Sequence, residues 1–175
     1  MLVPPAFARA ARALIFVAAA SSALLAQPTD PNTQVARAVR AHDEMRVDGR
    51  DLEAVWRSAP AHDEFYQFTP AEAGRARFRT EFKVAYDDRT LYVFVRAYDP
   101  RPDSLVALMS RRDIRTPSEW IKVVVDGFRD RRSGLQFMVN PAGVKRDANI
   151  YQDVAEDIAW DGVWDVATNI EQDAW

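Results

Sequence analysis

The chain has 175 residues, 48% of them hydrophobic and 28% charged, which fits one ordinary globular domain and excludes a disordered or collagen-like protein. Its formal net charge is −3, and after position 26 only 21 basic residues stand against 26 acidic ones, which argues against nucleic-acid binding. There is no cysteine, so neither a disulfide nor a lipid-anchored N-terminal cysteine is possible.

The first 26 residues predict a secretory signal peptide. Arg9 and Arg12 precede a short apolar run, and small residues follow it up to Ala26. A membrane anchor is the alternative, but the run is well short of the ~20 apolar residues of a spanning helix. We therefore expect cleavage between Ala23 and Gln27. Export without disulfides fits the periplasm or outer membrane of a Gram-negative bacterium.

A polar segment follows the signal peptide. Residues 27–43 contain prolines, aspartate and asparagine without apolar periodicity, which predicts a linker. Residues 45–56 then predict an edge strand, an Asp-Gly turn and one helical turn. Asp51 is placed to cap this helical turn, with Leu52 and Trp56 facing the core.

The strongest alternation of the chain lies between Arg77 and Tyr98 and predicts a hairpin with a turn at residues 87–89. Its first strand has one polar face, and its second strand is apolar on both faces. The polar face holds Arg79, Glu81, Lys83 and Ala85. A strand that is apolar on both faces favours the middle of a sheet with material packed over each side. Residues 105–110 are a candidate for a further short strand.

A second hairpin organises the remainder. Ile121–Val125 and Leu135–Val139 alternate around a polar loop, and Asn140-Pro141-Ala142-Gly143 predicts a turn after them. Further strands are predicted over Lys145–Tyr151 and Val163–Ile170. Since no stretch predicts a long amphipathic helix, the expected fold is all-β, a jelly-roll-like antiparallel β-sandwich.

Five sequence blocks now add up to a family resemblance. They are, in order, M-R-V-D-G-R-D-L-E-A-V-W, V-A-Y-D-D-R-T-L-Y-V-F-V-R-A-Y-D-P, R-R-D with S-E-W before V-V-V-D, F-M-V-N-P-A-G-V-K-R-D, and W-D-G-V-W-D-V-A-T. Residues 44–175 resemble the carbohydrate-binding module family 9-like domain, in the version found at the N-terminus of bacterial exported proteins with a predicted outer-membrane β-barrel. The resemblance implies a β-sandwich that binds sugar without catalysis, often with structural calcium. It also implies a further strand after Val163–Ile170, so we expect the chain as given to be incomplete as a folding unit.

The residue types of the chain do not favour a catalytic function. His42 and His62 lack metal-ligand spacing and have no serine-nucleophile motif nearby, which disfavours zinc and nucleophilic hydrolysis. A glycosidase pair of carboxylates is possible by type, yet most acidic residues occupy turn positions where aspartate is favoured for structural reasons. We expect a protein that is not an enzyme, and the hydrolase activity sometimes associated with the family would belong to partner domains.

An acidic stretch near the C-terminal end is a candidate calcium site. Calcium takes six to eight oxygen ligands, and five carboxylates fall within thirteen residues, although not in EF-hand spacing. They are Asp153, Glu156, Asp157, Asp161 and Asp165. A solvated acidic loop is the alternative, and the family resemblance leaves the two interpretations level.

A sugar site needs an aromatic plane and polar groups at its edge. Trp160 is the first candidate for the plane because it lies in the acidic loop, and Trp120 is the second, whereas Trp164 falls on an apolar strand face typical of a core. The loop before Trp120 supplies the candidate polar rim, Arg112, Asp113 and Glu119. The alternative is that Trp120 anchors the hairpin in the core and Arg112 pairs with Asp113 at the surface.

Three functions follow in order of preference. The first is a non-catalytic carbohydrate-binding domain of an exported protein, linked to carbohydrate catabolism, with a mono- or oligosaccharide as partner. The second is a structural or interaction domain that serves an outer-membrane barrel and has no sugar affinity. The third is haem binding, which relatives of the fold perform. It ranks last because haem needs axial ligands and the chain has two histidines.

Overall fold

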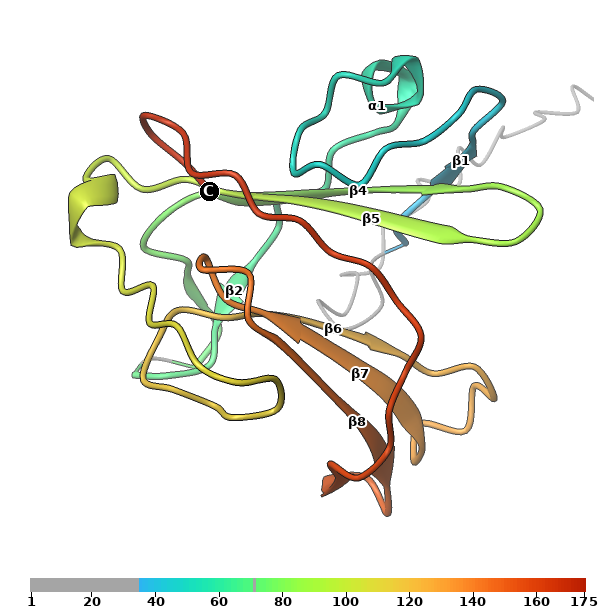
Figure 1. The fold of residues 1–175 in the computed structure, drawn as a ribbon, viewed down its shortest axis with the longest axis vertical. Coiled ribbons are helices and arrows are strands. Elements are labelled where there is room, and N and C mark those ends of the chain that lie inside the picture. The colour runs from blue at the N-terminus through green and yellow to red at the C-terminus, as the bar shows by residue number, and fades with distance from the viewer. Residues whose placement is uncertain (1–34, 71) are drawn as a thin grey trace, which may run out of the picture. The chain divides into compact units, whose positions relative to one another are not determined.

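The regular secondary structure is almost all β-strand in a computed structural model that describes residues 35–70 and 72–175, and long irregular segments connect the strands (Figure 1). The described helices are α1 (Ala54–Ser58) and the short 3-10 turn η2 (Pro102–Ser104). Neither these nor any other described segment forms a helix of the length and apolarity needed to cross a membrane. The all-β prediction is confirmed, while the predicted signal peptide lies outside the described residues.

The first sheet has three strands in the order β1-β4-β5. β4 (Thr80–Tyr86) and β5 (Leu91–Ala97) form the antiparallel hairpin that the alternation predicts. β1 (Ala38–Arg40) pairs with β4 in parallel, although it lies in the segment for which the sequence predicts a linker. A separate small antiparallel pair joins β2 (Tyr66–Gln67) to β3 (Gly74–Arg75).

The second sheet is an antiparallel meander in the order β6-β7-β8-β9 (Figure 1). Its strands are β6 (Ile121–Val125), β7 (Gly134–Val139), β8 (Lys145–Tyr151) and β9 (Ala155–Asp157). The predicted central hairpin is confirmed to within one residue, and β8 has the predicted bounds. Asp126 and Asp130 accept backbone N–H groups of the loop between β6 and β7, which explains how a polar loop of this length keeps one conformation.

Three predicted strands are wrong. The edge strand predicted within residues 45–56 is absent, and the regular structure there is α1, which begins at Ala54. Val163–Ile170 forms no strand, because no described segment pairs with its backbone. The side chains still alternate at its start, where Val163 is exposed and Trp164 is partly buried. Residues 105–110 also form no strand. They are held instead by the fully buried side chain of Asn140, whose amide donates to the carbonyl of Leu108 at 2.7 Å. Side-chain alternation follows from burial on one side, whereas a strand also needs a paired backbone.

The face of β4 predicted to be polar and solvated is the buried one. Ala85 is fully buried and Glu81 is 7% exposed, because α1 packs over this face with Trp56. The Trp56 ring lies 5.7 Å from the ring of Phe94 on β5. Leu52, predicted to face this core, is exposed instead.

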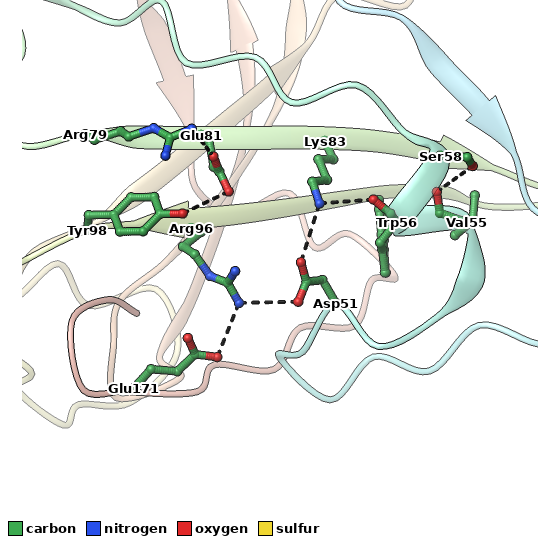
Figure 2. A network of polar contacts seen from close by, with 10 residues as sticks. All are labelled: Asp51, Val55, Trp56, Ser58, Arg79, Glu81, Lys83, Arg96, Tyr98 and Glu171. Carbon is green, nitrogen blue, oxygen red and sulfur yellow. Dashed lines mark hydrogen bonds and ion pairs between the residues drawn. The ribbon is translucent and has the colours of Figure 1, made fainter.

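A network of polar contacts explains how charged side chains are accepted on that face (Figure 2). The Asp51 carboxylate forms ion pairs with Lys83, at 3.4 Å, and with Arg96, at 3.3 Å. Arg96 forms a second ion pair with Glu171 at 3.3 Å. Asp51 therefore ties β4 and β5 to the segment before α1. Its predicted role as helix cap is wrong, since Glu53 occupies the N-cap position and makes no side-chain capping bond.

Glu81 has its own partners at one end of the same network (Figure 2). It accepts a hydrogen bond from Arg79 at 2.7 Å and another from the Tyr98 hydroxyl at 3.2 Å. A buried carboxylate is tolerated when its lone pairs are satisfied in this way. The polar residue pattern of β4 thus reflects paired charges rather than contact with water.

Candidate functional site

The centre of the candidate site is the guanidinium of Arg112. It donates to Asp147 at 2.7 Å and to the carbonyl of Gly162 at 3.2 Å, and it forms an ion pair with Asp161. Asp113 lies farther away, at 3.7 Å from the Arg112 Nε atom. Arg112 therefore connects the loop before β6, strand β8 and the segment after β9.

Asp147 is the buried member of this group. Its side chain is fully buried on β8, and its second oxygen accepts the backbone N–H of Gly162. Burial alone would raise the pKa of Asp147, but the Gly162 hydrogen bond and the pairing with Arg112 outweigh it and hold that pKa below its ordinary value. A negative charge is thus held beneath Arg112, and the hydrogen bond that Arg112 donates to Asp147 raises the pKa of Arg112.

Trp160 lies directly beside this charged group. Its ring meets Phe137 of β7 edge to face, with 6.0 Å between ring centroids, and remains partly exposed. A Cβ atom added to Gly162 would lie 2.7 Å from the Trp160 ring, so only glycine lets the chain pass so close to it. The Trp160 ring therefore lies against Gly162, whose N–H donates to Asp147 and whose carbonyl accepts from Arg112.

Trp164 packs deeper than a surface platform. Its ring centroid is 5.3 Å from that of Phe137, and the Lys145 ammonium lies 4.6 Å from the Trp164 ring centroid. The cation covers the ring from one side and also donates to the Trp164 carbonyl. This agrees with the core role predicted for Trp164.

The predicted sugar-site residues divide into two groups. Trp160, Arg112 and Asp113 come together around Gly162 and Asp147. Trp120 and Glu119 make other contacts at the start of β6: the Trp120 indole donates to the carbonyl of Thr116 at 3.1 Å, and the backbone N–H of Glu119 donates to the carbonyl of Val106. No hydrogen bond, ion pair or aromatic pair joins Trp120 or Glu119 to the Arg112 group within the described part of the chain.

The five predicted calcium ligands have separate surroundings. Glu156 pairs with Arg146 at 2.7 Å and with Lys122 at 3.6 Å. Of the others, Asp153 lies 3.9 Å from Arg132, Asp157 accepts the N–H of Ala159, Asp161 pairs with Arg112, and Asp165 is exposed. No group of three or more candidate metal ligands is found in residues 35–70 and 72–175. The calcium site stays a prediction.

The sequence reasoning missed a polar group on the opposite face of the second sheet. Gln136 on β7 is fully buried, and neither atom of its amide has a hydrogen-bond partner among the residues that the structure describes. Glu156 is linked to both Arg146 and Lys122 on this sheet, and the hydrogen bond from Arg146 holds the pKa of Glu156 below its ordinary value. The available signal was a glutamine within the apolar run of β7, since a buried amide is costly without a partner.

The arrangement around Arg112 offers an aromatic ring edged by fixed charged groups, which is the chemistry of a shallow binding site. Asp113 and the 74% exposed side chain of Asp161 remain accessible as hydrogen-bond acceptors. Arg112 is a donor whose position is set by buried Asp147. Comparison of the chain with protein-family models, curated proteins and solved structures finds no match.

Proposed function

We propose that this chain is a non-catalytic carbohydrate-binding domain of an exported bacterial protein and that its two main sheets pack as a β-sandwich. The observation that carries the proposal is the partly exposed Trp160 ring beside Arg112 and Asp161. A pyranose has an apolar face that stacks on an aromatic ring and a rim of hydroxyls that bonds charged side chains. Trp160 supplies the aromatic ring, and Arg112 and Asp161 supply the charged side chains beside it.

Pre-organisation is what allows such an open site to bind in water. Side chains that must be ordered on binding lose conformational entropy, at about 0.5–1.5 kcal/mol for each flexible side chain. Arg112 is already held by Asp147, and Trp160 is held by Phe137 and Gly162. The site remains shallow, so we expect affinities in the micromolar to millimolar range.

Titration of the full chain with mono- and oligosaccharides, followed by calorimetry or by NMR shifts, tests this proposal. Trp160→Ala should weaken binding at least about tenfold, because stacking on the ring is lost. Trp120→Ala is the matched control: it also removes an indole, but from a side chain outside the Arg112 group, and should leave affinity unchanged. Equal affinities of the wild type and Trp160→Ala, with unchanged melting, would locate sugar binding elsewhere.

A second candidate function is an interaction domain for an outer-membrane barrel without sugar affinity. It is favoured by apolar side chains on the outer face of the first sheet, where Leu91 is 53% exposed and Tyr86 and Val93 are also accessible. Exposed apolar groups that gather on one face are typical of contact surfaces. A glycan array without any bound sugar would favour this function over carbohydrate binding.

A further inference from the structure

The Arg112 group, which consists of Arg112, Asp113, Asp147 and Asp161, carries more negative than positive charge. Asp147 lies 2.7 Å and Asp113 3.7 Å from nitrogens of the guanidinium, and Asp161 forms the third ion pair. One positive charge therefore faces three negative ones, which gives a formal net charge of −2. No further ion pair reaches these four residues in the part of the chain that the structure describes.

The positive charge of Arg112 is directed inwards. Its Nε atom donates to Asp147 at 3.3 Å, and its Nη2 atom contacts Asp147, Asp161 and the carbonyl of Gly162. Because the fully buried Asp147 already balances this cation, a ligand that approaches from outside meets the charges of Asp113 and Asp161 uncompensated. Like charges repel, so a sugar that carries a carboxylate, sulfate or phosphate is disfavoured at this site.

The neighbouring charged residues do not reverse this balance. Lys145 lies over the Trp164 ring, with its ammonium 4.6 Å from the ring centroid, and the adjacent Asp165 is exposed, so these two residues add one charge of each sign. Arg111 and Arg115 are exposed on the loop before β6, and neither forms an ion pair with the Arg112 group within residues 35–70 and 72–175. The surroundings of Trp160 therefore remain acidic.

Asp161 is the carboxylate that a ligand can reach. Its side chain is 74% exposed, and only its Oδ1 atom pairs with Arg112, while Oδ2 makes no hydrogen bond or ion pair with the described residues. Asp113 is more enclosed, since it is 35% exposed and its Oδ1 atom accepts the backbone N–H of Asp147 at 3.3 Å. Asp161 directly follows Trp160 in the chain. A carboxylate oxygen is thus available beside the aromatic ring.

We propose that the Arg112 group selects cationic amino sugars over neutral sugars and excludes anionic ones. The apolar face of the sugar packs on Trp160, and its ammonium group pairs with Asp161. An indole ring also attracts a nearby cation, so the ring and the carboxylate favour the same ligand. This inference rests on the carbohydrate-binding function proposed above and names the class of sugar that the site takes.

NMR titration of the full chain with three methyl β-glycosides tests the proposal. The glucosaminide, the glucoside and the glucuronide share one type of ring and differ in charge, and a pH of about 6 keeps the amino group protonated. One exposed ion pair changes an affinity by a small factor, so the glucosaminide should bind about threefold more tightly than the glucoside and about tenfold more tightly than the glucuronide. These ratios should shrink towards one at about 1 M salt, which screens exposed charges.

Two variants separate Asp161 from the overall charge of the protein. Asp161→Asn should remove the preference for the glucosaminide over the glucoside. Asp153→Asn also removes an exposed carboxylate, but one outside the Arg112 group, and should keep the wild-type ratio. If Asp161→Asn does not fold, the salt dependence of the wild type decides in its place.

The outcomes distinguish this inference from the proposed function. Equal affinities for the three sugars, or tightest binding of the glucuronide, would refute the charge selection while carbohydrate binding stands. Equal loss of the preference in both variants would refute the role of Asp161. Absence of binding by all three sugars would refute carbohydrate binding itself, and the selection of amino sugars with it.

Discussion

Asp147→Asn is the sharpest test of the geometry around Arg112. Asparagine has nearly the same shape as aspartate, but it is neutral and keeps one acceptor oxygen where aspartate has two. Asp147 uses one oxygen for Arg112 and the other for the N–H of Gly162. The variant therefore leaves either the guanidinium or the Gly162 N–H facing an amide NH₂ group.

The magnitude follows from burial. Removal of one partner from a buried ion pair costs about 3–5 kcal/mol when the other charge stays buried. Asp147 is fully buried, but the Arg112 side chain is 38% exposed and regains hydration. We therefore expect a loss of about 2–3 kcal/mol in the free energy of unfolding, a large part of the roughly 5–15 kcal/mol typical of a domain.

The pH dependence of this loss identifies its cause. The pKa of Asp147 is lower in the folded chain than its ordinary value of 3.8. The stabilisation is therefore fully present above that ordinary value and is lost as pH falls through the folded pKa. The difference between wild type and Asp147→Asn should be largest near neutral pH and should shrink below about pH 3.8.

Urea denaturation at several pH values measures both effects. Asp165→Asn is the matched control, since it removes a neighbouring carboxylate that is exposed, and it should change the midpoint little. Equal midpoints of Asp147→Asn and wild type at neutral pH would refute the burial argument. A constant difference down to strongly acid pH would refute the electrostatic one.

Three further predictions concern other parts of the chain. Gly49→Ala should destabilise by about 1–3 kcal/mol in a denaturant melt, because Gly49 has φ of +79° and an added Cβ would lie 2.9 Å from the Asn169 nitrogen. Gly127→Ala, with open space around it, should not. Asn140→Ala should cost about 1–3 kcal/mol, because the Leu108 carbonyl and the Val144 N–H both lose a partner, and an unchanged midpoint would contradict this. Calcium should raise the melting temperature and EDTA lower it; a melt insensitive to both leaves the solvated-loop interpretation.

The sequence predicts single residues of the candidate site but not how they come together. Trp160, Arg112 and Asp113 were recognisable because an aromatic ring and charged groups in loops are local features. Asp147 is 35 residues from Arg112 in the sequence, and no local pattern marks it as the buried partner. Trp120 and Glu119 have equally suitable side chains but fall outside the group, because the loop before β6 directs them elsewhere.

The sequence by itself determined the hairpins and turns of this protein. β4 with β5 and β6 with β7 are specified by side-chain alternation and by turn residues within a short stretch, and these forces act between near neighbours. The tertiary structure alone decided which face of β4 is buried, because Trp56 arrives there from α1 and Asp51 neutralises the cations beside it. It also decided that Val163–Ile170 pairs with no strand of the described chain, since strand formation requires a partner backbone that no local pattern supplies.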